Sequence, residues 1–263
     1  MKTPFLNCST IETANQSIVN ILNISEKQLQ EELCRIKSVI ELEKIYIKDI
    51  ENLNDFIKII KIITHNDSPL NSILSKTEYL AYGLWFHSTR THDSEKIREK
   101  GLFPTSRIKS DLKKFLENLS HGLTSFGIYK NQAGASMKIA MGKEDDGPHA
   151  FLLKRLDCEN NFLEIPEIIE DIAGEILGEQ SDLLVERYKK ISKPCFVIFF
   201  APISQDDFLA AFLWIFLIFH NQPEEHLISE IKARNFNGKG SPVPPNDIYD
   251  IEFINTEIHP FLK

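Results

Sequence analysis

The sequence predicts a mixed α+β protein in which a helical N-terminal region precedes a domain of alternating short helices and strands. Two observations carry this prediction. Over residues 25–63, leucine and isoleucine recur at three- and four-residue steps, which is the period of one face of an α-helix. Farther along, "PCFVIFFAPI" (194–203) is almost entirely apolar, as is typical of a strand that is buried on both faces.

The helical region is expected to end near residue 65. Ser25 followed by Gln28 fits a capping box, in which each side chain bonds the backbone of the other residue. The stretch "NDSP" (66–69) interrupts the pattern, because proline pushes the residue before it out of the helical region. We therefore predict a helical N-terminal extension over residues 1–75 and a mixed α+β domain over residues 76–263.

The second domain shows short helices that end on glycine. Residues 93–101 and 110–122 are helix candidates that close on Gly101 and Gly122, and Asp93 suits the N-terminus of the first. Residues 165–177 form a third candidate, with Pro166 in its first turn. Strands are expected at residues 80–87, 125–130, 150–156 and 194–203, and the proline-rich stretch 242–254 should end in a final strand.

The longest apolar run is "FLAAFLWIFLIF" (208–219). At 12 residues it is shorter than the ~20 residues that cross a bilayer, so we expect a buried helix and no membrane partner. The N-terminus lacks the pattern of a secretory signal. These features, with four cysteines that form no CxxC pair (Cys8, Cys34, Cys158 and Cys195), favour a cytoplasmic protein without disulfides.

The net charge of −8 argues against nucleic acid as the main partner, since phosphate backbones need a concentrated basic surface. The acidic loop "KEDDGPH" (143–149) is interpreted as a solvated turn and not as a metal site, because consecutive acids point in different directions. No metal ligand set is therefore predicted.

One polar stretch has no evident role in folding. In "WFHSTR" (85–90) an apolar strand candidate runs into His87, Ser88, Thr89 and Arg90, an imidazole, two hydroxyls and a guanidinium. A guanidinium in this setting suits a diphosphate. The alternative for His87 is a strand-end side chain bonded to a backbone carbonyl, and for Arg90 a partner in a surface ion pair.

An aromatic-His-Ser-Thr strand, a helix that carries an isoleucine and then "GL" resembles the first motif of ADP-ribosyltransferases. The branch concerned has a His-Tyr-Glu set and includes diphtheria toxin and poly(ADP-ribose) polymerases. The stretch "FGIYKNQAGASMKIA" (126–140) resembles the second motif of that branch. The resemblance implies an ADP-ribosyltransferase-like α+β domain with a split antiparallel sheet over residues 76–263, with NAD as its substrate.

The resemblance also implies roles for the matching residues. His87, with Ser88 or Thr89, would bind the ribose and adenosine of NAD, and Tyr129 would stack on the nicotinamide ring. Gly127 lies in the strand and Ser136 in the helix of the second motif. Cleavage of the nicotinamide–ribose bond needs an oriented ribose and stabilised positive charge at the anomeric carbon. ADP-ribose would pass to a macromolecular acceptor such as a protein, or NAD would be hydrolysed.

The chain departs from the family pattern at the late glutamate. When Val243 and Ile248 are matched to that motif, Gly240 stands at the glutamate position, which leaves Glu230 and Asp247 as substitute acids. The alternative function is a catalytically inactive nucleotide-binding or protein-interaction module of the same fold. In a third interpretation both motif matches are accidental, and the helices of residues 1–65 and 208–219 make oligomer contacts.

Overall fold

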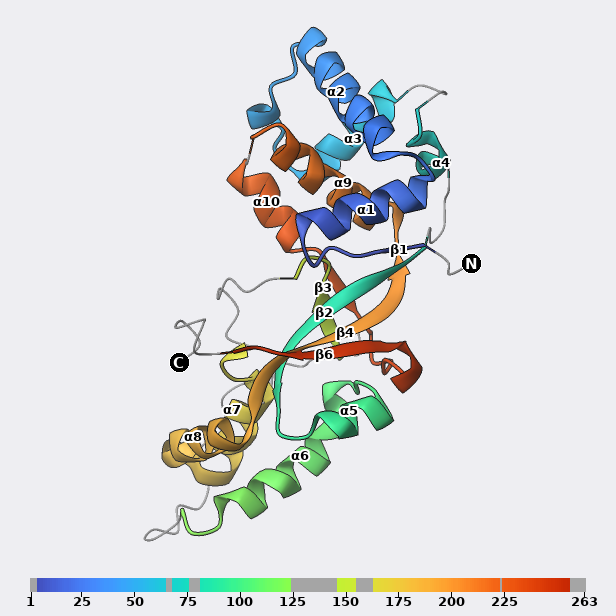
Figure 1. Ribbon diagram of the computed structural model, residues 1–263. Helices are drawn as coiled ribbons and strands as arrows, with labels where there is room; N and C mark the ends of the chain where they lie inside the picture. The colour runs from blue at the N-terminus through green and yellow to red at the C-terminus, as the bar shows by residue number, and fades with distance from the viewer. Residues whose placement is uncertain are drawn as a thin grey trace. The chain divides into compact units, whose positions relative to one another are not determined.

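The structure is a computed structural model that describes residues 4–64, 68–75, 81–123, 146–154, 163–222 and 224–255. It is of mixed α+β class, which confirms the class predicted from the sequence (Figure 1). Contacts between Cα atoms group the chain into two compact units. The first unit holds residues 1–85, 151–155 and 200–235, and the second holds residues 86–150, 156–199 and 236–263.

The expected domain boundary between residues 75 and 76 stays a prediction, because grouping by contacts does not show which segment folds alone. Two long strands have residues in both units: β2 (Ala81–Thr91) and β4 (Lys193–Ile203). The chain therefore passes between the units several times.

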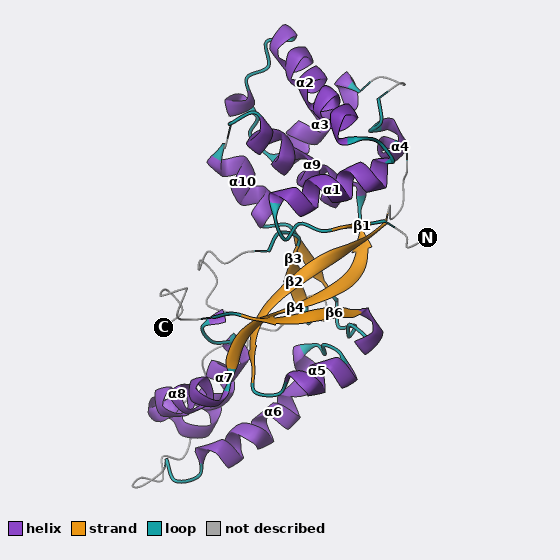
Figure 2. Cartoon of the chain, in the orientation of Figure 1, coloured by secondary structure: helices purple, strands orange, loops and turns teal. Residues whose placement is uncertain are grey.

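The first unit is built mainly from helices that pack around α9 (Figures 1 and 2). Helices α1, α3 and α10 each contact α9. The side chains of α9 from Phe208 to Leu217, except Trp214, are buried, which confirms the expected buried helix. The helices of this unit are α1 (Ile11–Leu22), α2 (Glu26–Leu42), α3 (Leu53–Ile63), α4 (Asn71–Leu74), α9 (Gln205–Phe219) and α10 (Glu225–Lys232).

The helical period over residues 25–63 does not correspond to one helix. The capping box of Ser25 and Gln28 is confirmed, and α2 begins directly after it. The helix ends at Leu42, Lys44 takes a left-handed φ of 53°, and a short 3-10 turn, η1 (Ile47–Asp49), follows. The Asn52 side chain then accepts from the Asp55 N–H and starts α3. The polar N-cap Asn52 thus starts a new helix within a stretch whose apolar residues keep the helical spacing, and it divides residues 25–63 into two helices.

The described strands form one sheet, seen in Figure 2, with the order β5-β3-β2-β4-β6 and with β1 paired to β2. Strands β4 and β6 are antiparallel, with Val197 opposite Ile251, whereas β1 runs parallel to β2. The bounds not yet given are β1 (Phe5–Leu6), β3 (His149–Phe151), β5 (Asn235–Asn237) and β6 (Ile248–Phe253).

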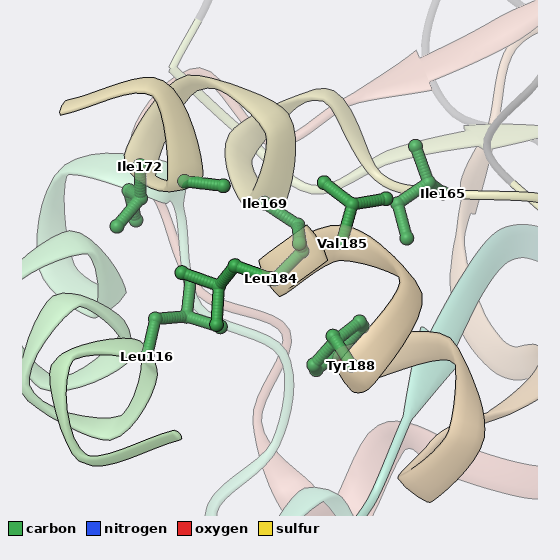
Figure 3. Packing of buried hydrophobic residues seen from close by; sticks show 8 residues of the cluster. Leu116, Ile165, Ile169, Ile172, Leu184, Val185 and Tyr188 are labelled. Carbon is green, nitrogen blue, oxygen red and sulfur yellow. The ribbon is translucent and has the colours of Figure 1, made fainter. Parts of the chain in front are cut away.

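The second unit has a hydrophobic core between three helices, α6 (Thr105–Ser120), α7 (Glu167–Leu177) and α8 (Ser181–Ile191). Figure 3 shows labelled side chains of this core gathered between these helices. Its buried members are Leu116, Ile165, Ile169, Ile172, Ala173, Leu184, Val185 and Tyr188. The remaining helical segments are α5 (Ser94–Lys100), η3 (Gly178–Gln180) and η4 (Pro245–Asp247).

Several helices and strands predicted for this unit are present, but some begin or end at other residues than expected. Helix α5 has Asp93 as its N-cap and Gly101 after its last residue, as expected. Helix α6 begins at Thr105 and not at residue 110. Of the strand expected at residues 150–156, the described residues 150–154 contribute only Ala150 and Phe151 to β3 (His149–Phe151). The strand expected at 125–130 lies outside the described residues.

The most consequential difference is the length of β2. The strand was expected to end at residue 87, but it continues to Thr91. The stretch His87–Arg90 therefore lies within the strand, and its side chains alternate between the two faces. Among the described residues, no helix is long and apolar enough to cross a membrane.

Candidate functional site

A cavity of about 610 Å³ lies in the second unit beside the end of β2. This volume lies within the range of small-molecule sites, roughly 300–1,000 Å³. Its walls come from β2, α5, α6, the start of α7, and α8, all of which Figure 1 labels. The lining combines apolar side chains, aromatic rings and charged groups, which is the composition expected of a ligand site.

The core of the unit supports one wall of this cavity. Ile169 and Tyr188 belong both to the core cluster and to the cavity lining. Leu112, Phe115 and Ile168 also line the cavity and pack against that core. Because these side chains are held by packing on their far side, the apolar wall is preformed and does not depend on a ligand for its shape.

Strand β2 supplies polar groups to the cavity, among them Arg90 and three alternate residues. His87, Thr89 and Thr91 line it, as the alternation of a strand requires for three residues on one face. Ser88 is not among the lining residues. Two members of the "HST" motif therefore meet in one cavity, and the third does not.

The His87 imidazole is held in one tautomer. Its Nδ1 lies 2.6 Å from the carbonyl oxygen of His149, and since a carbonyl can only accept, Nδ1 carries the proton. Burial lowers the pKa of His87, and the bond to the His149 carbonyl opposes this only in part. The ring is therefore neutral at pH 7, with Nε2 as a hydrogen-bond acceptor. It is suited to accept from a hydroxyl group and not to bind an anion.

The Arg90 guanidinium is bonded to backbone carbonyls and a hydroxyl of the protein. Its Nε donates to Ser192 Oγ at 3.2 Å, Nη1 donates to the Leu163 carbonyl at 3.2 Å, and Nη2 donates to the Lys189 and Ser192 carbonyls at 3.2 and 3.1 Å. Four of the five N–H groups of a guanidinium are thus bonded to protein acceptors. A diphosphate would have to displace these bonds, so the geometry does not support the phosphate role expected for Arg90.

Aromatic rings form a corner of the cavity next to this arginine. The His92 ring stacks on Phe115 with centroids 4.1 Å apart and planes 7° from parallel, and Tyr188 meets both rings edge-on. The Tyr188 hydroxyl donates to the Arg90 carbonyl at 3.0 Å. These three rings, the aromatic corner, offer apolar faces of the kind on which a base can pack.

The charged lining is more basic than acidic. Besides Arg90, the cations are Lys96 and Lys100 on α5 and Arg107 on α6. The two acids are Asp93 and Asp111, and Asp93 is already engaged as the N-cap of α5, where Oδ1 accepts from the Lys96 N–H at 3.0 Å. In a chain of net charge −8, this local excess of positive charge points to an anionic ligand.

Glu230, the predicted substitute acid, lies on α10 in the first unit. Its Oε2 accepts from the Leu53 N–H at 2.6 Å, at the first residue of α3. A carboxylate at a helix N-terminus satisfies a backbone donor and interacts favourably with the helix dipole. The bond to Leu53 therefore gives Glu230 a structural role. Glu230 is not among the residues that line the cavity beside His87.

The second-motif residues Gly127, Tyr129 and Ser136 lie outside the described residues, so their expected roles stay predictions. Gly240, which the resemblance matches to the glutamate, takes a φ of 78°. Asp247, the other substitute acid, lies in η4 and is not among the residues that line the cavity.

Sequence reasoning missed several charged and aromatic residues of the cavity that lie outside β2, among them Lys96, Lys100, Arg107, Asp111, Phe115 and Tyr188. A signal was present: Lys96 and Lys100 are four residues apart in the helix that follows the "HST" stretch, and so share one face. A short helix rich in charge is normally a solvated face, so this spacing by itself does not indicate a ligand site.

Within the described part of the chain, no group of three or more His, Cys, Asp or Glu side chains is placed to hold a metal ion. Cys195 is buried, and burial raises its pKa to about 12, so its thiol is not an activated nucleophile. Comparisons with protein-family models, curated proteins and solved structures find no match to this chain.

Proposed function

We propose that this protein is an ADP-ribosyltransferase-like protein that binds NAD, and that the cavity beside His87 is its nucleotide site. The observation that carries the proposal is that His87 and Thr89, from the motif that resembles the family, line one cavity of about 610 Å³. In this site the neutral His87 ring accepts from a ribose hydroxyl through Nε2, and Thr89 forms a second hydrogen bond to the sugar.

A contact between distant segments supports the same proposal. Leu102, from the "GL" that ends the first motif, bridges to Val243 in the proline-rich stretch that was matched to the late motif. Their backbones exchange hydrogen bonds of 3.0 and 2.8 Å. The first and last segments of the resemblance are thus neighbours in the second unit, as one nucleotide-binding domain requires.

Calorimetric titration with NAD tests the proposal. Thr89→Val keeps the shape of the side chain and removes the hydroxyl, so we expect about tenfold weaker binding from the loss of one hydrogen bond. Ser88→Ala is the matched control, because Ser88 is the neighbouring hydroxyl on the strand and does not line the cavity. We expect the control to bind as the wild type does. Absence of NAD binding to the wild-type protein would refute the proposed function.

ADP-ribosyl transfer or NAD hydrolysis is the second candidate function. The observation that favours it is Asp111, whose carboxylate belongs to the same cavity as His87 and caps no helix. A carboxylate near the anomeric carbon would stabilise the positive charge that develops when the nicotinamide bond breaks.

Release of nicotinamide from NAD tests this second candidate function, because both transfer and hydrolysis free the nicotinamide. If Asp111 supplies the acid, Asp111→Asn should abolish release and leave NAD binding within about twofold of the wild type. Glu230→Gln is the control, since its carboxylate caps α3 and should not affect turnover. NAD binding without any release from the wild type would mean that the protein is a binding module.

A further inference from the structure

We propose that Lys96, Lys100 and Arg107 form an anion-binding rim of this cavity, the basic rim, which holds the phosphate groups of the ligand in place of Arg90. This inference deepens the proposed function and rests on it for the identity of the ligand as a nucleotide. The basic rim itself depends on the charges of the cavity and not on the resemblance.

The three cations of the basic rim come from neighbouring helices. Lys96 and Lys100 come from α5 and Arg107 from α6, so two consecutive helices direct positive charge to one cavity. All three cationic residues are exposed to solvent. The aromatic corner and the wall formed by Leu112, Ile168 and Ile169 instead present mainly apolar side chains to the cavity. The cavity therefore has one wet, basic side and one apolar side.

Among the described residues, these cations have no ion-pair partner that would compete with a ligand. Neighbouring basic side chains do have partners: Lys109 and Lys113 bind the Glu175 carboxylate at 2.9 and 3.0 Å, and Arg98 binds Asp250 at 3.1 Å. For Lys96, Lys100 and Arg107, no ion pair with a described residue is found. The acids that pair with these neighbours are therefore not available to the basic rim. Of the two acids that line the cavity, Asp93 is the N-cap of α5, which leaves the carboxylate of Asp111 against three cations.

Arg90 differs from these three cations in that its guanidinium is already bonded to the protein. Its guanidinium is half-buried and bonded to three carbonyls and the Ser192 hydroxyl, which fixes the end of β2 to α8 and to the residues before α7. A phosphate at this point would have to break bonds that the fold uses. Exposed lysines and an exposed arginine can turn toward a phosphate without such a cost.

The basic rim and the aromatic corner together favour one class of ligand in one orientation. A molecule with an aromatic or sugar portion and a diphosphate can place the first against the aromatic corner and the second at the basic rim. His87 and Thr89 lie on the β2 side of the same cavity and bond sugar hydroxyls. ADP-ribose, the nucleotide portion of NAD, has this composition.

Calorimetric titration with two probes, ADP-ribose and inorganic pyrophosphate, tests the basic rim. Lys100→Gln and Arg107→Gln should each weaken binding of both probes about tenfold at low salt, as expected for loss of one charge-assisted bond. Lys114→Gln, on α6, is the matched control, since it removes the same charge from an exposed residue that does not line the cavity. Its affinity for both probes should equal that of the wild type.

Arg90→Gln is the second comparison. We expect it to lower the free energy of unfolding and to leave the affinity of the folded protein for pyrophosphate within about twofold of the wild type. If this variant does not fold, the Lys100 and Arg107 variants still decide the question.

The possible results separate this inference from the proposed function. ADP-ribose binding that Lys100→Gln and Arg107→Gln leave unchanged would overturn the basic rim and keep the nucleotide site. Pyrophosphate binding that depends on both residues, without binding of ADP-ribose, would keep the basic rim and overturn the nucleotide site. If neither probe binds the wild-type protein, both proposals are wrong.

Discussion

At the scale of single residues, neighbouring side chains of one motif have different tasks. His87 lines the cavity and keeps an acceptor nitrogen available, because its other nitrogen is bonded to the His149 carbonyl. Arg90, three residues on, bonds backbone carbonyls of the fold. Sequence reasoning grouped the two as ligand-binding residues, since residue type alone does not reveal which acceptors a guanidinium meets.

His87 gives the protein a specific response to acid. Its pKa is below the ordinary 6.5 in the folded state, so on acidification the unfolded chain takes up the proton first. Linkage then makes the free energy of unfolding fall as the pH drops through about 6.5, until the pH reaches the lower folded-state pKa. At pH 8 neither state binds this proton, and the stability contribution is fully present.

We therefore expect His87→Gln to flatten the dependence of stability on pH. Between pH 7.5 and 5.5 the wild type should lose up to about 1 kcal/mol more stability than the variant does. Urea unfolding at several pH values measures this difference. His92 and His220, whose pKa values are also lowered by burial, are present in both proteins and cancel in the comparison. Equal slopes for the two proteins would show that His87 is not the titrating group.

At the scale of elements, the turn after α5 brings the end of that helix against the proline-rich segment. Gly101 follows the last residue of α5 at a φ of +84°, and a Cβ atom there would lie 2.0 Å from the Val243 carbonyl oxygen. The next residue, Leu102, makes the bridge to Val243. Only glycine allows the helix to end this close to the proline-rich segment.

Gly101→Ala should lower the free energy of unfolding by about 3 kcal/mol or more, through backbone strain and the clash together. Gly122→Ala is the matched control, because Gly122 has a similar φ of +79° but no atom of the described residues within 4 Å of an added Cβ. For this control we expect a loss of about 1 kcal/mol from the left-handed backbone alone. Urea unfolding of both variants separates the two effects, and similar losses would mean that the Val243 backbone moves aside at little cost.

At the scale of the whole molecule, the first unit is assembled from segments far apart in the chain. Helix α9 packs against α1 and α3, and its Phe208, Phe212 and Phe216 are fully buried. Polar contacts join the same parts: His220 Nε2 bonds the Leu33 carbonyl, and His226 Nε2 bonds the Ile50 carbonyl. The N-terminal helices thus depend on residues 200–235 for part of their core.

A fragment of residues 1–75 should therefore not fold cooperatively. Without α9, the apolar faces of α1 and α3 lose the side chains that cover them, and a short chain has little other surface to bury. Thermal unfolding followed by circular dichroism, with the full chain as control, measures this. A sharp transition in the fragment would show that residues 1–75 form an independent domain, as the sequence-based division proposes.

The sequence by itself determined the local features that depend on nearest neighbours along the chain. The capping box of Ser25 and Gln28, the limits of α5 at Asp93 and Gly101, and the buried helix α9 were all readable, because caps and apolar periods act over a few residues. The mixed α+β class followed from the same patterns.

The tertiary structure alone decided which residues share a site. Lys96, Arg107 and Phe115 join His87 in one cavity because α5 and α6 fold back beside β2, and no pattern in the sequence specifies that return. In the same way, Glu230 became a cap for Leu53, 177 residues away along the chain. The partners of a charged side chain are set by packing between distant segments, and residue type limits only which partners it can accept.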